Sequence, residues 1–204
     1  MNLQEFSPEN EKHLEKAYQL LRFCEGDEKH ASQVHRLALQ LYDQLDPRLS
    51  FPGQARIWLE CAAVLHDIGW FQGRKRHHKA SLDTILSTPI LDFQNKDRII
   101  IGSIARYHRK AIPSQSHDHY AVLSKKEQKV VQELSGILRL ANAMDASHSS
   151  VVFKIKTKIK NDHITILCYT NEEAVEEKKK SEKNCKLLES ACGKPISLVW
   201  KITT

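Results

Sequence analysis

An imidazole and a carboxylate stand at the end of an apolar helical pattern, in Ala-Val-Leu-His-Asp-Ile-Gly at 63–69. Adjacent residues on a helix point about 100° apart, but where a helix frays both side chains can converge on one ion. An imidazole nitrogen and a carboxylate oxygen together suit a first-row divalent metal. His66 and Asp67 therefore predict a metal site, although a His-Asp dipeptide also arises by chance.

Other polar residues of metal-binding type occur on apolar helical faces. His30 shares a face with Val34, Leu37 and Leu41, so it is predicted to point inward, whereas His35 lies off that face. Each such residue alone is better explained as a capping or hydrogen-bonded core group. Together they favour a metal site, because a buried Asp needs a counter-charge. The further candidates are the pair Asn142 and Asp145, spaced three apart on one helix face, and His77, His78 and His108.

The elements that must position these residues divide the chain at about residue 150. Helical periodicity runs through 30–45, 54–66, 78–86, 96–107 and 125–144. Residues 151–160 and 163–169 then alternate as a hairpin, 172–192 is charged and helical, and 196–202 closes as a strand. The predicted fold is mainly α: an all-helical domain over 1–148 followed by a small β-β-α-β subdomain over 151–204.

Composition narrows the class of protein. The 204 residues are 41% hydrophobic and 27% charged, which excludes collagen-like and largely disordered chains. No apolar stretch reaches the roughly 20 residues of a membrane span, and no secretory signal or cysteine framework is visible, so a cytoplasmic protein is expected. The net charge of +6 and the pI near 9.0 favour an anionic partner such as a phosphate ester.

The motifs, taken in order, resemble the HD superfamily of metal-dependent phosphohydrolases. More closely, the chain resembles the C-terminal half of Ppx/GppA exopolyphosphatase and guanosine pentaphosphate phosphatase proteins, from about residue 10 to its end. The stretches that carry the resemblance are His-Ala-Ser-Gln-Val at 30–34 with Leu-Ala-Leu at 37–39, the 63–69 stretch, His-His-Lys-Ala-Ser at 77–81, Ala-Arg-Tyr-His-Arg-Lys at 105–110, and Leu-Arg-Leu-Ala-Asn-Ala-Met-Asp-Ala-Ser-His at 138–148.

The resemblance implies a divalent metal, whether Mn, Mg, Zn or Fe, and hydrolysis of a phosphate ester or phosphoanhydride. A first ion would be held by His30, His66 and Asp67 and closed by Asn142 or Asp145. A second ion would be held by His77 and His108 with Asp67 bridging, His78 remaining the alternative to His77. Asp67 and His108 are the catalytic candidates. The residues expected to contact the phosphate are Lys79, Arg106, Arg109, Lys110 and Arg139, with Arg74 and Lys75 as weaker candidates.

Two departures from these families keep a second hypothesis open. The actin-like domains that hydrolyse phosphate in full-length Ppx/GppA proteins are not expected within 204 residues, and Asn142 stands where many HD proteins have an Asp ligand. The alternative is therefore a non-catalytic polyphosphate- or alarmone-binding module. Partners are expected to be phosphorylated small molecules or polyphosphate; a homodimer is left open, and no motif favours nucleic acid. The lysines at 154, 156, 158 and 160 are better explained by strand solubility than by a polyanion.

Overall fold

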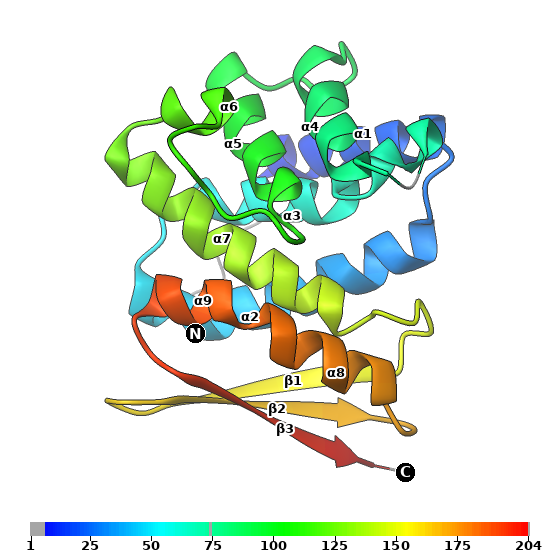
Figure 1. Ribbon diagram of the computed structural model, residues 1–204. Coiled ribbons are helices and arrows are strands. Elements are labelled where there is room, and N and C mark those ends of the chain that lie inside the picture. The colour runs from blue at the N-terminus through cyan, green and yellow to red at the C-terminus, as the bar shows by residue number, and fades with distance from the viewer. Residues whose placement is uncertain (1–6, 74, 204) are drawn as a thin grey trace.

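In a computed structural model of the protein, which describes residues 7–73 and 75–203, helices occupy most of the chain and a small sheet closes it (Figure 1). The helical part consists of α1 Pro8–Phe23, α2 Glu28–Leu49, α3 Ala55–Leu65, the 3₁₀ helix η1 Ile68–Gln72, α4 His77–Ser87, α5 Asn95–Arg106, α6 Asp118–Ala121 and α7 Lys125–Ala143. The remaining elements are β1 Val152–Ile159, β2 Ile164–Thr170, α8 Val175–Asn184, α9 Lys186–Cys192 and β3 Ile196–Ile202.

Side chains at the helix starts fix where the long helices begin. Asp27 caps α2 by accepting a hydrogen bond from the His30 amide at 3.0 Å, so His30 lies in the first turn of that helix. Ser124 and Glu127 form a reciprocal capping box at the start of α7. These caps hold the ends of the two helices that carry His30 and Asn142.

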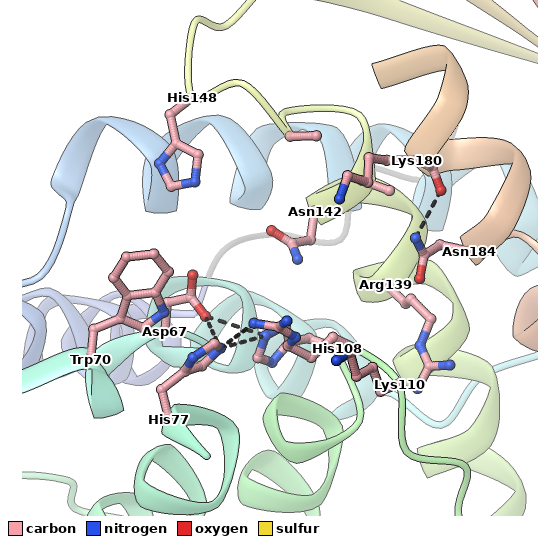
Figure 2. Close-up of a pocket in the computed structure, with 13 residues that line it drawn as sticks. Asp67, Trp70, His77, His108, Lys110, Arg139, Asn142, His148, Lys180 and Asn184 are labelled. Atoms are coloured by element: carbon pink, nitrogen blue, oxygen red, sulfur yellow. Dashed lines mark hydrogen bonds and ion pairs between the residues drawn. The ribbon is translucent and has the colours of Figure 1, made fainter. Parts of the chain in front are cut away.

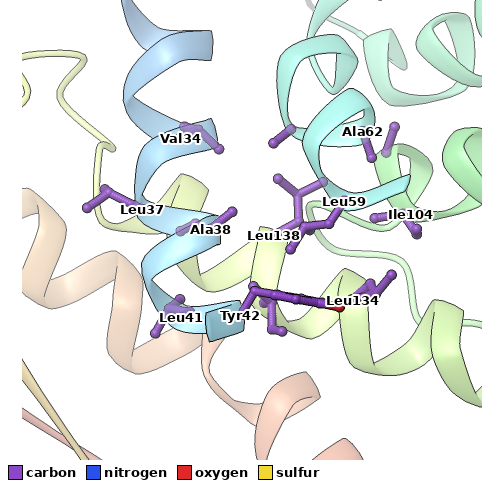
Figure 3. Packing of buried hydrophobic residues seen from close by; sticks show 14 of the residues in the cluster. Val34, Leu37, Ala38, Leu41, Tyr42, Leu59, Ala62, Ile104, Leu134 and Leu138 are labelled. Atoms are coloured by element: carbon purple, nitrogen blue, oxygen red, sulfur yellow. The ribbon is translucent and has the colours of Figure 1, made fainter. Parts of the chain in front are cut away.

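The core lies between α2, α3, α5 and α7. Each of these helices contributes buried side chains to one cluster, among them Leu37, Leu59, Ile104 and Leu138, and none of these four is exposed (Figure 3). Burying a side chain of this size contributes about 1.5–3 kcal/mol relative to leaving it in water. The apolar stripes that pack this core also set the direction in which His30 and Asn142 point.

The three strands form one sheet in the order β1-β2-β3, with β1 and β2 antiparallel and β2 and β3 parallel. Side chains of α2 pair with the outer edge of β1: Gln40 Oε1 accepts from the Ile155 amide at 2.7 Å, and Gln44 Oε1 accepts from the Thr157 amide at 2.6 Å. This edge is therefore satisfied without a fourth strand. The sheet lies across one end of the helical part, and α9 packs against α7 (Figure 1).

The predicted fold class, mainly helical with a small β-β-α-β end, is confirmed. The predicted helical segment over 172–192 begins at Val175 and is divided at Cys185 into two consecutive helices, α8 and α9. The division into domains over 1–148 and 151–204 stays a prediction, since buried side chains of both parts belong to one continuous cluster. Within the described residues, no helix is both long and apolar enough to cross a membrane.

Candidate metal centre

The His-Asp pair lies where α3 ends and η1 begins. Buried residues make up most of α3, His66 is its C-terminal cap, and Asp67 precedes η1. The His66 side chain is 1% exposed. Because the chain turns there, the imidazole and the carboxylate both face inward, as the 63–69 stretch predicted.

Gly69 brings the start of α4 close to this turn. A Cβ at position 69 would lie 2.2 Å from the His77 carbonyl oxygen and 2.5 Å from the Ser81 amide nitrogen, so only glycine fits. The Ser81 hydroxyl accepts from the Gly69 amide at 3.0 Å and donates to the His66 carbonyl at 2.8 Å. This contact between η1 and α4 places His77 beside Asp67.

His30, His66 and Asp67 form a first group of metal-binding atoms. The Nε2 atoms of His30 and His66 are 3.3 Å apart, and His66 Nε2 lies 3.5 Å from Asp67 Oδ2. Asn142 Oδ1 is 3.0 Å from His30 Nε2, so the amide reaches the same space. We call His30, His66 and Asn142 the first half of the centre.

Asp67, His77 and His108 form a second group. Asp67 Oδ1 lies 3.2 Å from both His77 Nε2 and His108 Nε2, and those two nitrogens are 3.4 Å apart (Figure 2). We call His77 and His108 the second half of the centre. Asp67 belongs to both groups, with one oxygen near each half.

The convergence of these atoms fits a cation. His66 Nδ1 donates to the Ala63 carbonyl and His108 Nδ1 donates to the Ala105 carbonyl, each at 2.7 Å. In the neutral rings, Nε2 therefore presents a lone pair toward Asp67, and Asp67 Oδ1 is buried without a hydrogen-bond partner. Burial lowers the pKa of His66 to about 3, which keeps that ring neutral. A divalent ion bound here would coordinate these acceptor atoms, which face one another with no donor between them.

Asp67 is ionised in this setting. Burial acts to raise the pKa of its carboxyl, but when the neighbouring rings carry protons on Nε2, the charge of His66 and the hydrogen bonds from His108 and His77 outweigh burial and lower that pKa well below its usual range. The structure thus provides a carboxylate, rather than a neutral acid, between the two halves.

Asp145 does not occupy the ligand position that the sequence offered it. Its Oδ2 accepts from His30 Nδ1 at 2.7 Å and its Oδ1 accepts from the Ser150 amide at 2.8 Å. Both oxygens are therefore engaged behind the His30 ring, and Asn142 is the residue that faces the centre. Burial opposes protonation of His30, but hydrogen bonding and attraction to Asp145 raise its pKa overall.

Between His77 and His78, the geometry favours His77. His77 is 1% exposed and belongs to the second group, whereas His78 is half-buried and belongs to neither group. Burial, followed by the nearby charge of Arg106, lowers the pKa of His78 to about 4. His78 is thus a neighbour of the centre rather than one of its ligand candidates.

The centre opens into a pocket of about 270 Å³ that is rich in positive charge, which we call the cationic pocket. Arg109 and Lys110, two of the residues predicted to contact phosphate, line it, and Arg109 Nη1 lies 3.3 Å from His77 Nε2. Asp67 is the carboxylate among the described lining residues, whereas the cations are Arg109, Lys110, Arg139 and Lys180 (Figure 2).

Arg139 lines the pocket but its guanidinium is largely committed elsewhere. Nε donates to the Tyr107 carbonyl at 2.9 Å, and Nη2 donates to the carbonyls of Tyr107 and Ala111. Burial lowers the pKa of Arg139 to about 10. These bonds hold the turn around Lys110, whose φ of 46° lies in the left-handed region. These bonds tie Arg139 to the turn that carries His108, Arg109 and Lys110, and its phosphate contact stays a prediction.

Two other predicted phosphate contacts lie outside the described lining of the cationic pocket. Arg106 is 6% exposed, and its guanidinium carbon lies 5.9 Å from the centroid of the Tyr107 ring. Lys79 is exposed on α4, and Lys75 is exposed just before that helix. Arg74, also proposed from the sequence, lies outside the described residues.

Several lining residues were not expected from sequence. His148 stacks on His30 with ring centroids 3.7 Å apart, and its Nδ1 donates to Asp27 Oδ2 at 3.0 Å. Trp70 of η1 and Lys180 and Asn184 of α8 complete the wall. The i, i+4 spacing of Lys180 and Asn184 places them on one face of a helix, but in a charged helix such a face is usually only solvated, so the sequence did not single them out.

Comparison with known proteins identifies a family for this chain. The sequence model of the family described as "Ppx/GppA phosphatase, domain III" matches residues 14–192. The chain is similar to a guanosine-5'-triphosphate,3'-diphosphate pyrophosphatase of Pseudoalteromonas atlantica, with 25% identity over 134 residues. That match covers 65% of this chain and 26% of the relative, so the chain spans about a quarter of the relative's length.

Proposed function

Since the chain belongs to the Ppx/GppA phosphatase domain III family, we propose that it is a divalent-metal-dependent phosphohydrolase of the HD type. Its substrate is a phosphate ester or phosphoanhydride: a nucleotide, a guanosine polyphosphate or a short polyphosphate. The family and the pyrophosphatase relative support a link to guanosine polyphosphate or polyphosphate metabolism. The HD assignment is our own inference from the His and Asp groups.

The observation that carries the proposal is the convergence of imidazole nitrogens and Asp67 oxygens in two groups that share Asp67. One ion would be held by the first half with Asp67, and another by the second half with the same carboxylate. A bound divalent ion would supply an activated water and charge stabilisation on phosphate oxygens. His66 and His108 would present neutral Nε2 atoms, because their Nδ1 protons are fixed on backbone carbonyls.

The residues of the cationic pocket would bind and orient the phosphate. Arg109 lies next to His77, so its guanidinium can hold phosphate oxygens beside the second half. Lys110 and Lys180 add positive charge further along the wall. Arg139 keeps the Tyr107–Ala111 turn in place, so that His108 and Arg109 approach the phosphate from one side.

Asn142 supports a second candidate, a binding module without catalysis. Its amide is neutral and reaches His30 Nε2, so one carboxylate, Asp67, serves both groups. A polyphosphate or alarmone could then occupy the cationic pocket without hydrolysis. A homodimer and a cytoplasmic location remain predictions under either candidate.

Phosphate release separates the two candidates. Nucleotides, guanosine polyphosphates and tripolyphosphate would be tested with manganese, magnesium, zinc and iron, after chelation and after return of the metal. We expect hydrolysis that chelator abolishes, that metal restores and that His66→Ala removes. His163→Ala, on the β1–β2 turn, is the matched control and should retain the activity. Metal-dependent binding without phosphate release from any substrate would favour the binding module.

A further inference from the structure

A second pocket adjoins the metal centre. It has a volume of about 450 Å³ and is lined by the loop between α1 and α2, by η1 and by His148. We call it the aromatic lobe, and the residues used below are Glu25, Asp27, Asp67, Trp70, Phe71 and His148.

The aromatic lobe and the cationic pocket adjoin each other along a shared wall. Asp67, Trp70 and His148 line both of them. In the close-up, Trp70 lies beside Asp67 and His148 lies above them, with the Trp70 and His148 ring centroids 6.5 Å apart (Figure 2). A molecule with a phosphate at the metal centre can therefore extend past Asp67 into the lobe.

The two compartments differ in chemistry. The described lining of the aromatic lobe contains no Arg or Lys, whereas the cationic pocket has four of them. Glu25 and Asp27 place carboxylates in the lobe, and these repel a phosphate. Phosphate groups therefore belong in the cationic pocket, and the lobe suits a neutral group that carries N–H donors.

Aromatic surface at the lobe indicates the shape of that group. Phe71 is 57% exposed and Trp70 is 39% exposed, both on η1 directly after the His-Asp pair. Large apolar side chains held at the mouth of a pocket commonly contact a ligand. A flat heteroaromatic ring can stack on such a surface, and its amino or imino groups can donate hydrogen bonds to the Glu25 carboxylate.

We propose that the aromatic lobe binds the base of a nucleoside phosphate whose phosphate groups occupy the cationic pocket. This inference rests on the proposed function and narrows it, because the substrate becomes a nucleotide rather than inorganic polyphosphate. Phe71 supplies the stacking surface and Glu25 accepts hydrogen bonds from the base, while Asp67 marks the junction with the metal centre.

The test compares two substrates that carry the same three phosphates. Nucleoside triphosphates bearing each of the four bases are assayed beside inorganic tripolyphosphate, and the readout is the ratio of kcat/KM for nucleotide to kcat/KM for tripolyphosphate. We expect the wild type to favour nucleotides and Phe71→Ala to lower the ratio roughly tenfold, the scale of one base–aromatic stack. Glu25→Gln should change the order of preference among the four bases.

Phe153→Ala is the matched control, because Phe153 is 43% exposed on β1 and belongs to neither compartment. It should leave the ratio unchanged. A ratio that Phe71→Ala does not alter, or hydrolysis of tripolyphosphate in preference to every nucleotide, overturns the inference while the proposed function stands.

A binding experiment distinguishes the case in which the base site exists but the protein does not hydrolyse phosphate. The same substrates would be titrated calorimetrically into the protein, with each Kd compared between the wild type and Phe71→Ala. Nucleotide binding that depends on Phe71, without hydrolysis of any substrate, would support the base site and refute the phosphohydrolase. Equal Kd values for nucleotide and tripolyphosphate in both proteins would refute the base site.

Discussion

The two halves of the candidate metal centre share Asp67 but are built differently. In the first half, a buried carboxylate, Asp145, accepts the Nδ1 proton of His30 at 2.7 Å. In the second half, His108 donates its Nδ1 proton to a neutral backbone carbonyl, and the Arg109 guanidinium approaches His77. One half is therefore supported by negative charge behind its ligand, and the other faces positive charge.

This difference predicts that the two halves bind their ions with different affinities. A carboxylate behind an imidazole makes that ring a stronger metal ligand, so Asp145 offsets the neutral amide of Asn142. The second half lies next to Arg109, which repels a cation but attracts a phosphate. We therefore expect the first half to hold its ion more tightly, and the second half to gain affinity when an anionic substrate is present.

The largest effect is expected from Asp67→Ala, because it removes the residue that both halves share. Metal affinity should fall at both halves by more than the roughly 10–100-fold typical of an outer-shell change, and hydrolysis should be lost. Isothermal titration and phosphate-release assays measure the two effects. Asp162→Ala, an exposed residue in the β1–β2 turn, serves as the control.

Asp145→Asn tests the first half by itself. It removes the charge behind His30 and should weaken the tighter metal site by about 10–100-fold, with the second half changed little. Circular dichroism checks that the buried substitution leaves the fold intact. If both sites weaken equally, the two halves are not independent and the comparison fails.

Asn142→Asp adds a carboxylate where the amide now reaches His30 Nε2. Metal affinity at the first half should rise by an order of magnitude or more, because a charged oxygen is a stronger ligand for a hard cation. Competition with a fluorescent chelator would quantify the gain. An unchanged affinity would mean that the residue at 142 does not reach the ion.

Gly69→Ala tests how the second half is positioned. The added Cβ would press on the His77 carbonyl and the Ser81 amide, so α4 must shift, at a cost of about 1–3 kcal/mol for overpacking. The second half should lose a few-fold in metal affinity. Gly53→Ala is the matched control, because a Cβ there meets nothing within 4 Å. Thermal unfolding and metal titration of both variants distinguish local strain from general destabilisation.

The sequence predicted the part of the site that helical periodicity determines. His30 follows the apolar stripe of α2, and the His66-Asp67 pair ends a buried helix, so their inward direction could be worked out from residue spacing. The choice between Asn142 and Asp145 could not be made from sequence, because α7 ends at Ala143 and beyond that residue the spacing of a helix no longer applies. The turn after α7 instead directs Asp145 behind His30.

Lys79 and Arg106, whose phosphate contacts stay predictions, lie outside the described lining of the cationic pocket for a different reason. Each stands two residues from a ligand candidate, Lys79 from His77 and Arg106 from His108. His77 and Lys79 both lie on α4, where residues two apart differ by about 200° in direction, so Lys79 points away from His77. Arg106 is instead the last residue of α5, and its guanidinium lies over the Tyr107 ring. Arg109, in contrast, follows His108 after α5 has ended, where the turn brings it into the pocket. Closeness in sequence to a ligand candidate therefore does not predict that a residue lines the pocket.

The number of metal ions bound per chain tests most directly the claim that two metal sites share Asp67. Metal-free protein would be titrated with manganese, and bound ions counted by equilibrium dialysis for the wild type and Asp67→Ala. Two groups that share Asp67 predict two ions per wild-type chain, bound with different affinities, and loss of both in the variant. No saturable binding in the wild type, or two ions retained by Asp67→Ala, would contradict a shared metal centre.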